Sequence, residues 1–303
     1  MLEICVMWEQ QITEITDGNA KTLARCISLV ENEAAGYEAL LQQLPVSSTP
    51  VIGITGPPGA GKSTLVDALI GSLRQSGKTV AVICVDPSSP FNLGALLGDR
   101  IRMSEWYNDP GVFIRSLATR GSLGGLHPKI IEISDLMKTA PYDYIIVETV
   151  GVGQSEIEIA GLADITVVVV VPEAGDEVQT MKAGLMEIAD IFVVNKSDRP
   201  DADLFVKNLR MMLAPAFHNH QLPVPVIKTV ASQKQGITEL MEAIEQGFMQ
   251  TTHNEKHDWL MAEKAYYLIQ QKKMIGINKA ELKQKIAESG NAFNLYQFIK
   301  KYV

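Results

Sequence analysis

Two short segments of the chain carry residue types and spacings that suit nucleotide chemistry. The first matches G-x-x-x-x-G-K-[ST], a loop whose backbone N–H groups surround phosphates, and consists of Gly56, Pro57, Pro58, Gly59, Ala60, Gly61, Lys62 and Ser63, followed by Thr64. The second, Asn195-Lys196-Ser197-Asp198, matches N-K-x-D, whose aspartate can select guanine. Each segment follows an apolar run, so each is predicted to lie at the end of a strand. Together they predict a guanine-nucleotide hydrolase.

The first segment is predicted to bind phosphates through its backbone and two side chains. Glycines let successive N–H groups converge on an anion, and the following helix directs its positive end toward it. Lys62 is expected to place its ammonium at the β- and γ-phosphates, and the Ser63 hydroxyl is expected to bind Mg²⁺. Residues 64–70 have helical spacing, which supplies the strand–loop–helix context that the motif requires. The alternative, a chance Gly/Pro turn, does not explain the second motif.

The second segment is predicted to distinguish guanine from adenine. The Asp198 carboxylate can accept hydrogen bonds from N1–H and the exocyclic amine of guanine, whereas adenine would leave the carboxylate unpaired. Asn195 is expected to tie the base to the loops, and the stem of Lys196 to lie along the base. A strand-ending turn is the local alternative, but the position about two βα units after the phosphate loop favours the base site. Weaker candidates for a base contact are Ala231 and Ser232.

Acidic residues end two further apolar, strand-like runs. Asp86 ends the first and Glu148 the second. Because the carboxyl ends of parallel strands meet at one edge and Mg²⁺ prefers carboxylate oxygens, both acids are expected near the metal together with Ser63. A turn or helix cap before a proline is the alternative for Asp86. Gly151 is expected to donate its N–H to the γ-phosphate, which would make the following segment sensitive to hydrolysis.

One residue that many GTPases use is not at its usual place. The attacking water is typically oriented by a Gln, often directly after the glycine that corresponds to Gly151, but this chain has Val152 there and its nearest Gln is Gln154. We therefore expect slow intrinsic hydrolysis that a partner accelerates. A scaffold that binds nucleotide without hydrolysing it is the alternative.

Over roughly residues 10–250 the chain resembles the MeaB/ArgK family of P-loop GTPases. The segments that carry the resemblance, besides the two motifs, are Val85-Asp86-Pro87-Ser88-Ser89-Pro90, Gly98-Asp99-Arg100, residues 115–125 (RSLATRGSLGG) and residues 148–156 (ETVGVGQSE). The last two are far more specific than the generic GTPase motifs.

The resemblance implies a chaperone that works with GTP or GDP and Mg²⁺. Members of the family gate adenosylcobalamin delivery to acyl-CoA mutases, chiefly methylmalonyl-CoA mutase, and protect or reactivate the mutase. By this resemblance Asp86, Asp99 and Glu148 are the acids expected around the metal, and the catalytic candidates are Lys62, Glu148 and Lys182. Lys182 ends residues 173–182, which resemble the family's extra switch. A solvated helix lysine is an equally good interpretation of Lys182.

The elements that must hold these residues follow from the hydrophobic pattern. Residues 50–232 alternate strand-like runs with helical stretches, which predicts the α/β fold of P-loop NTPases with a doubly wound, mostly parallel sheet. Residues 165–171 are expected to form an interior strand covered on both faces. Helical patterns flank this region on both sides.

Three parts are therefore expected along the chain. They are an N-terminal helical extension at residues 1–45, a P-loop GTPase domain at residues 46–250, and a C-terminal helical extension at residues 251–303 that serves a homodimer. Breaks between the C-terminal helices are expected at residues 276–278 and 289–291. We interpret two apolar clusters, residues 211–213 and 266–269, as core rather than interface.

Composition narrows the class of partner. The chain has 303 residues, 46% hydrophobic and 20% charged, with a net charge of −8, which argues against nucleic acid and anionic membranes as partners. The longest apolar run is too short to span a bilayer, and no secretory signal pattern opens the chain. Three widely spaced cysteines suit a reducing compartment. A cytoplasmic location is expected.

Two rival functions remain to be weighed. A metallocentre-assembly GTPase usually carries a Cys or His cluster, whereas this chain has no C-x-x-C and only two weak histidine pairs, His218 with His220 and His253 with His257. A transport-linked ATPase or kinase conflicts with Asp198, and no H-R-D motif is present.

Overall fold

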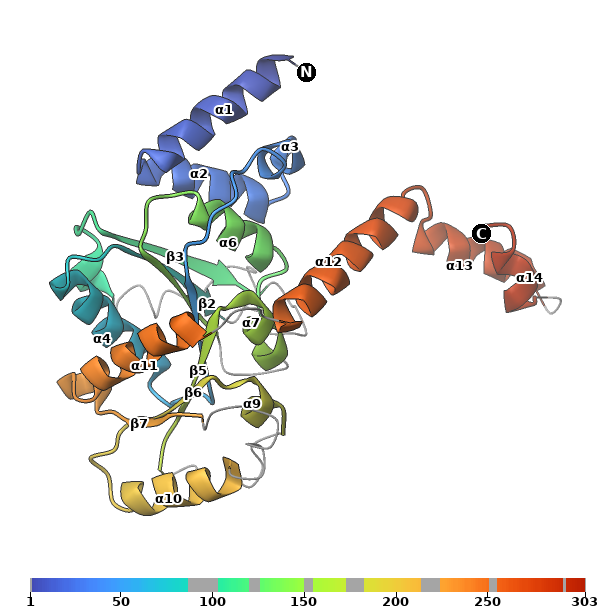
Figure 1. The fold of residues 1–303 in the computed structure, drawn as a ribbon. Helices are drawn as coiled ribbons and strands as arrows, with labels where there is room; N and C mark the ends of the chain where they lie inside the picture. Colours follow the sequence, from blue (N-terminus) through green and yellow to red (C-terminus); the bar gives the residue numbers. More distant parts are fainter. Residues whose placement is uncertain are drawn as a thin grey trace. The chain divides into compact units, whose positions relative to one another are not determined.

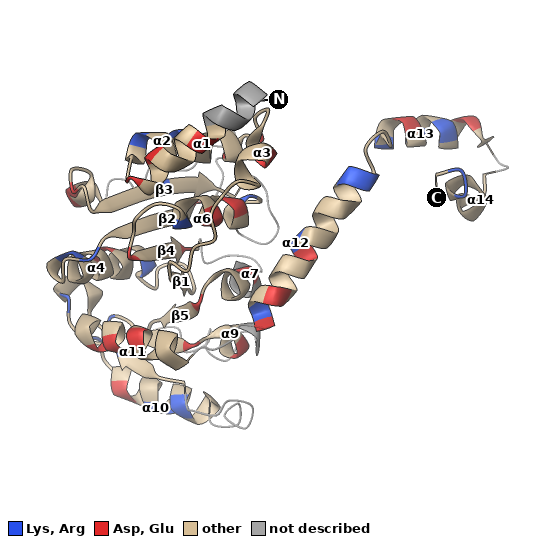
Figure 2. Ribbon diagram, turned by 45° about the horizontal axis from the view of Figure 1, so that its top comes forward, with Lys and Arg blue, Asp and Glu red and all other residues tan. Residues whose placement is uncertain are grey.

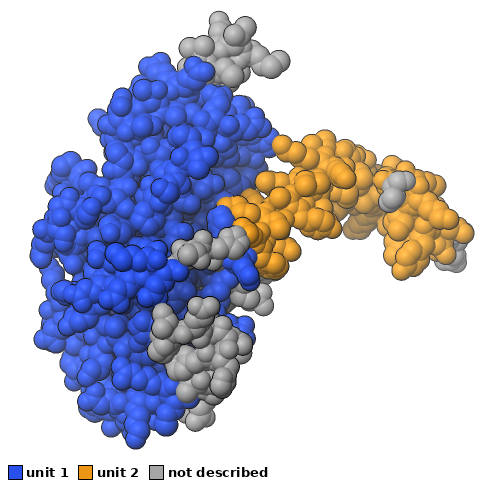
Figure 3. Space-filling view, viewed as in Figure 1, with its two compact units in different colours: residues 1–257 blue, residues 258–303 orange. Residues whose placement is uncertain are grey.

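The computed structural model describes residues 2–86, 103–119, 126–149, 155–172, 183–213, 224–250, 255–290 and 293–302. The chain divides into two compact units, Met1–His257 and Asp258–Val303, which are coloured separately in Figure 3. Each unit is described by itself.

Seven strands form one parallel sheet at the centre of the first unit (Figure 1). The strands are β1 (Val51–Thr55), β2 (Val80–Asp86), β3 (Val112–Ala118), β4 (Tyr144–Glu148), β5 (Ile165–Val170), β6 (Ile191–Val194) and β7 (Val226–Lys228). They lie in the order β3-β2-β4-β1-β5-β6-β7, and every neighbouring pair is parallel. The predicted doubly wound sheet is confirmed, and it is parallel throughout. As predicted, β5 is an interior strand that is buried along its whole length.

The strand order explains where loops can bind a ligand. From β1 the chain crosses to β2 on one side, and from β4 it crosses over β1 to β5 on the other. This reversal of direction lies beside β1, and open α/β sheets bind ligands in the crevice at the carboxyl ends of the strands at such a point. The phosphate loop follows β1 directly.

The two faces of β1 pack against different helices. Ile52 and Ile54 belong to a buried core with residues of α4 (Lys62–Gln75) and α11 (Ile237–Gln250). Gly53 faces α7 (Ser155–Leu162), where an added Cβ would lie 2.7 Å from Ile159 Cγ1. The glycine therefore allows α7 to approach the sheet closely. The described residues of the sheet domain also form α6 (Ile130–Lys138), α9 (Ala183–Ile188) and α10 (Ala202–Leu213), with short 3₁₀ turns η1 (Ser104–Trp106) and η3 (Ala231–Gln233).

Charged residues are concentrated on helices and at strand ends (Figure 2). Within the strands that the structure describes, the only charged residues are Asp86, Arg115, Glu148 and Lys228. Three of these end their strands, at the edge of the sheet where the candidate motifs lie. The fourth, Arg115, interrupts the apolar pattern of the edge strand β3, and the apolar runs singled out in the sequence did not include this strand.

Three N-terminal helices, α1 (Leu2–Thr16), α2 (Ala20–Glu31) and α3 (Tyr37–Leu41), belong to the first unit. α2 packs on α6. Arg115 of β3 attaches the sheet edge to α2, because its guanidinium lies 2.5 Å from Glu31 Oε2 and donates to Ser28 Oγ at 3.1 Å. A residue that carries the family resemblance thus joins two parts of the unit.

The C-terminal helices are α12 (Glu255–Lys273), α13 (Lys279–Glu288) and α14 (Leu295–Ile299), and all but the first three residues of α12 belong to the second unit. The break expected at residues 276–278 is confirmed, since Gly276 has φ 92° and Asn278 caps α13 by accepting from the Ala280 N–H at 2.8 Å. At the second expected break α13 ends at Glu288 and Gly290 has φ 52°, while Asn291 lies outside the described residues. No described residue of these helices is buried. The core interpretation of residues 266–269 is therefore wrong, since Tyr266, Tyr267 and Ile269 are all more than half exposed.

The core interpretation of residues 211–213 is confirmed for Leu213 and wrong for Met211 and Met212. Leu213 is buried at the end of α10, as a core residue should be, whereas Met211 and Met212 are exposed.

Among the residues that the structure describes, no helix has the length and apolar character needed to cross a membrane.

Candidate nucleotide site

The phosphate loop takes a path that only glycine permits at two positions. Gly56 has φ 140°, and a Cβ there would lie 2.1 Å from the carbonyl oxygen of Val169 on β5. Gly61 has φ 89°, and a Cβ there would lie 2.4 Å from Asn195 Nδ2. The loop is thus pressed against β5 and against the second motif, and α4 begins immediately after it at Lys62. The N-terminal N–H groups of α4 make this end of the helix suited to an anion.

Lys62 is buried with its ammonium folded over the loop. Its Nζ donates to the carbonyl oxygens of Gly56 at 2.9 Å and Pro57 at 3.1 Å, and the residue is 7% exposed. A buried ammonium needs acceptors because the charged form is costly to desolvate. The loop carbonyls supply them at the place where phosphate oxygens are expected.

The structure brings Ser63 and Glu148 together across the sheet. The Ser63 hydroxyl donates to Glu148 Oε1 at 2.7 Å, and both residues are buried. Asp86 is also buried, at the end of β2, and β2 and β4 are neighbours in register Cys84↔Glu148. These hydroxyl and carboxylate oxygens are ligands of the type that hard cations prefer.

Among the described residues no group of three or more His, Cys, Asp or Glu side chains is arranged to hold a metal. A set of one hydroxyl and two carboxylates nevertheless fits Mg²⁺, which usually keeps several waters and binds through one or two carboxylates plus substrate phosphates.

Of the histidines considered as ligands, His257 lies with Nδ1 2.9 Å from the Gly161 carbonyl oxygen. His218, His220 and His253 lie outside the described residues.

The second motif is attached to the first by the Asn195 side chain. Its Nδ2 donates to the Ala60 carbonyl oxygen at 2.9 Å, and its Oδ1 accepts from the Thr229 hydroxyl and the Ala231 N–H, each at 3.1 Å. One buried amide therefore joins the phosphate loop, the loop after β6 and the loop after β7. This is the joining role expected of Asn195 between loops.

Thr229 is a residue of this network that the sequence analysis missed. Besides its bond to Asn195, its N–H donates to the Val194 carbonyl at 2.9 Å, and its carbonyl accepts from the Ser197 N–H at 3.0 Å. It therefore fixes the backbone on both sides of Asn195. The available signal was a polar residue two positions after the apolar run that ends at Ile227.

Three other residues predicted near the base, Lys196, Asp198 and Ser232, are less buried than Asn195. Lys196 has φ 55°, and its Nζ donates to the Gly59 carbonyl oxygen at 2.8 Å, so its stem spans from the base loop to the phosphate loop. Asp198 and Ser232 are exposed. Within the described part of the chain the Asp198 carboxylate makes no hydrogen bond, so it is accessible to an incoming base.

Three predicted site residues cannot be placed. Asp99, Gly151 and Lys182 lie outside the described residues, as do Val152 and Gln154. The remaining candidates lie at the last residues of β2 and β4 or on the loops and first turns that follow β1, β6 and β7. The sheet thus gathers them at its carboxyl edge, as expected for an α/β fold.

Comparison with known proteins places this arrangement in a family. The family model "Methylmalonyl Co-A mutase-associated GTPase MeaB" matches residues 23–288. A putative GTPase of Pyrococcus horikoshii is 47% identical over 243 residues, covering 78% of this chain and 77% of the relative. The GTPase ArgK of Escherichia coli is 39% identical over 246 residues, covering 78% and 74%. A crystal structure titled LAO/AO transport system kinase matches with TM-score 0.67 and 26% identity, covering 98% of this chain and 96% of that chain.

Proposed function

Because the chain belongs to the MeaB family of methylmalonyl-CoA mutase-associated GTPases, we propose that it binds GTP with Mg²⁺ and uses the nucleotide state to gate adenosylcobalamin loading of an acyl-CoA mutase of the methylmalonyl-CoA mutase type. In this proposal it also protects or reactivates the mutase. That the chain is a P-loop GTPase follows from the family. The choice of client rests on the family's association with the mutase.

The observation that carries the nucleotide site is the Asn195 amide, which holds the phosphate loop and the base loop in one structure through Ala60, Thr229 and Ala231. A ligand that spans a phosphate-binding loop and a guanine-selecting carboxylate is a guanine nucleotide. We propose that the backbone of residues 56–64 surrounds the phosphates and that Asp198 selects the base, with Lys196, Ala231 and Ser232 beside it.

Lys62 is proposed to transfer its hydrogen bonds from the loop to the nucleotide. The carbonyls of Gly56 and Pro57 accept from Nζ in this structure. Phosphate oxygens carry more negative charge than carbonyls, so they attract the Lys62 ammonium more strongly than the loop carbonyls do. The exchange therefore favours binding, and the same ammonium stabilises charge that develops at the transferred phosphoryl group.

Mg²⁺ is proposed to be held by Ser63, with Glu148 and Asp86 completing the surrounding oxygens. When bound, the ion neutralises charge on the β- and γ-phosphates. The Ser63 hydroxyl donates its proton to Glu148, which leaves the lone pairs of its oxygen for the ion. The buried Glu148 carboxylate holds that hydroxyl in place. Asp99 as a further metal contact, Gly151 as a γ-phosphate contact and Lys182 as a catalytic or switch residue remain proposals from sequence.

The chain is proposed to hydrolyse GTP slowly on its own. With Val152 where many GTPases carry the water-orienting Gln, a step that depends on that side chain is expected to need another group. We propose that the complex with the mutase supplies or orders it. Cys26 and Cys84 are buried and form no disulfide bond within the described structure, which supports a reducing compartment such as the cytoplasm.

The C-terminal helices are proposed to form a homodimer, with residues 1–45 as a helical addition to a GTPase domain at 46–250. Support comes from the large exposed apolar residues of the second unit, which are Trp259, Tyr266, Tyr267, Ile269, Met274, Ile275, Leu295, Tyr296 and Ile299. Exposed apolar side chains in this density are typical of an interface. Light scattering on the full chain should give a dimer mass, and Tyr266→Glu with Ile269→Glu should give a monomer. A wild-type monomer at high concentration would contradict the proposal.

The experiment that tests the function is GTP turnover by the full chain, alone and with a cobalamin-dependent acyl-CoA mutase from the same source. We expect slow turnover alone and a higher rate with the mutase. Competition by ATP at equal concentration should have no effect, because Asp198 selects guanine. An unchanged rate with no complex in either nucleotide state would refute the choice of client, and equal competition by ATP would refute the base assignment.

A further inference from the structure

The end of β4 is attached to the end of β1 by two hydrogen bonds that the proposed chemistry does not use. The Thr149 N–H donates to the Ile54 carbonyl oxygen at 3.0 Å, and the Thr149 hydroxyl donates to the Thr55 hydroxyl oxygen at 2.9 Å. Both threonine side chains are buried, with exposures of 0% for Thr55 and 1% for Thr149. The pair joins positions 94 residues apart in the chain.

Each threonine adjoins a residue of the nucleotide site. Thr149 directly follows Glu148, whose carboxylate accepts from Ser63. Thr55 directly precedes Gly56, the turn that starts the phosphate loop and whose carbonyl accepts from Lys62. The hydroxyl pair therefore adds a side-chain contact between the acid's strand and the start of the loop, besides the pairing of Glu148 with Ile54 and Cys84.

The position of the Glu148 carboxylate depends on its backbone as well as on the Ser63 contact. A glutamate side chain has three rotatable bonds, so a hydrogen bond at its tip fixes the carboxylate only if its backbone is also fixed. Site residues must be held within about 0.5 Å, and a displacement of about 1 Å can cost on the order of 100-fold in rate. The parallel ladder between β1 and β4 ends at the pair Ile54↔Glu148, to which the Thr149 N–H bond to Ile54 belongs, so the hydroxyl pair of Thr149 and Thr55 is the contact that lies beyond the ladder.

We propose that Thr149 is a positioning residue, and that its hydroxyl pair with Thr55 holds Glu148 at the place where Mg²⁺ is shared with Ser63. This inference rests on the proposed function, since it assumes a Mg²⁺–guanine nucleotide complex. It assigns to Thr149 no contact with the nucleotide. Its effect is therefore confined to the part of binding and turnover that depends on the metal.

The test is Thr149→Val, which keeps the β-branched shape but removes the hydroxyl donor. Affinity for a fluorescent N-methylanthraniloyl GDP is measured in excess Mg²⁺ and in EDTA, together with the single-turnover rate with GTP. We expect the affinity in EDTA to stay within about twofold of wild type. The affinity in Mg²⁺ and the turnover rate should each fall about tenfold, which corresponds to about 1.4 kcal/mol. Thr149→Ser should restore both.

Two further variants make the result specific. Thr55→Val removes the other hydroxyl and should reproduce the defect, and the double variant should be no worse than either single one, because coupled residues are not additive. Thr166→Val is the matched control. Thr166 is also a buried threonine of the sheet, 1% exposed, but its hydroxyl has no hydrogen-bond partner within the described structure.

The outcomes separate this inference from the function on which it rests. A Thr149→Val protein that loses affinity equally in EDTA and in Mg²⁺, or that changes only in unfolding midpoint, would show a merely structural role and overturn the inference. Wild-type turnover would in that case still support the GTPase. A wild-type chain without Mg²⁺-dependent binding of guanine nucleotide would refute the proposed site and the inference together.

Discussion

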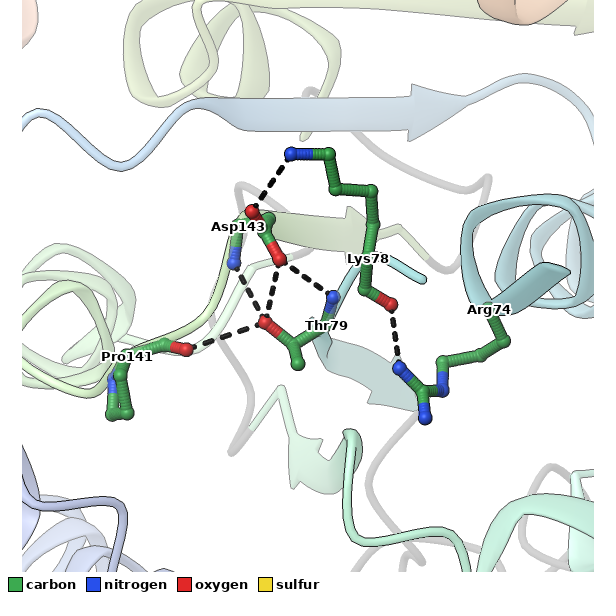
Figure 4. A network of polar contacts seen from close by, with 5 residues as sticks. All are labelled: Arg74, Lys78, Thr79, Pro141 and Asp143. Atoms are coloured by element: carbon green, nitrogen blue, oxygen red, sulfur yellow. Dashed lines mark hydrogen bonds and ion pairs between the residues drawn. The ribbon is translucent and has the colours of Figure 1, made fainter. Parts of the chain in front are cut away.

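The two ends of the central sheet contain similar polar residues but use them differently. At the amino end, Asp143 accepts from the Thr79 N–H at 2.7 Å and from Lys78 Nζ at 3.1 Å, and its Oδ2 lies 2.9 Å from the Thr79 hydroxyl (Figure 4). The Thr79 hydroxyl also lies 3.2 Å from the Pro141 carbonyl oxygen. Arg74 extends the network by donating to the Lys78 carbonyl at 2.8 Å and pairing with Asp109 at 2.9 Å.

At the carboxyl end the polar groups converge on a loop. Lys62 and Lys196 both donate to carbonyls of the phosphate loop, and the Ser63 hydroxyl donates to Glu148. Backbone carbonyls are weaker partners for an ammonium than phosphate oxygens, so a nucleotide can replace them. The comparison teaches that acids and lysines at the amino end satisfy one another and fix the strands, whereas those at the carboxyl end hold positions that a ligand can take over.

The largest effect on nucleotide binding should come from Lys62→Ala at the carboxyl end of the sheet. Without this effect, the contrast between the two ends would not hold. The change removes the ammonium expected at the β- and γ-phosphates, so GTP affinity should fall at least about 100-fold, or about 2.7 kcal/mol. The urea midpoint without nucleotide should stay near that of wild type. Lys207→Ala, at an exposed position of α10, is the control and should leave titration with fluorescent GDP unchanged. Unaltered binding by Lys62→Ala would remove the phosphate loop from the site.

Gly61→Ala tests whether the contact between the phosphate loop and Asn195 matters for binding. Its Cβ would lie 2.4 Å from Asn195 Nδ2 at a φ of 89°, so both the loop and the base motif must shift. We expect GDP affinity to fall more than about tenfold, since both the strain and the lost Asn195 bond disfavour the bound form. Gly59→Ala is matched, because Gly59 also has positive φ (77°) but nothing lies within 4 Å of its added Cβ. Equal losses for the two variants would show that conformational strain alone is responsible.

At the amino end, Asp143→Ala should change stability and leave nucleotide affinity alone. The partly buried Thr79 N–H loses its acceptor, which typically costs about 1–2 kcal/mol. Urea unfolding should show this as a lower midpoint at equal slope. The control is Asp203→Ala, because Asp203 pairs with Lys228 at 2.8 Å but its side chain is 89% exposed. Solvent screens such a pair, so no measurable change is expected. A fall in GTP affinity for Asp143→Ala would contradict the separation of the two ends.

The smallest expected effect is a pH dependence of the amino-end network. Hydrogen bonding from the Thr79 N–H, helped by the Thr79 hydroxyl and the Lys78 ammonium, lowers the pKa of Asp143 below its ordinary value. A lowered folded-state pKa means that the stabilisation is present above the unfolded-state pKa of about 3.9 and is lost as pH falls through the folded-state value. The difference in unfolding free energy between wild type and Asp143→Asn should therefore be full at pH 6 and shrink below about pH 4. A difference that stays constant to pH 3 would exclude this origin.

Much of the fold was predictable because its signals are local. The apolar runs of the sequence predicted β1, β2, β4, β5 and β6, and the glycine and asparagine breaks predicted the boundaries of the C-terminal helices. The edge strand β3 was missed because Arg115 interrupts its apolar pattern, which is tolerated because Glu31 and Ser28 of α2 accept hydrogen bonds from the guanidinium. The exposed tyrosines of α12 were misjudged because an apolar cluster has the same composition whether it lies in a core or awaits a partner.

The sequence by itself determined which residues can hold phosphate, a divalent cation and guanine, because these depend on side-chain chemistry and on turn geometry within a few residues. Only the tertiary structure decided that Ser63 meets Glu148, that Asn195 reaches Ala60, and that Thr149 reaches Thr55. Each of these contacts depends on the placement of β4 and β5 on either side of β1. That order is set by packing helices on both faces of the whole sheet, which no local pattern of residues encodes.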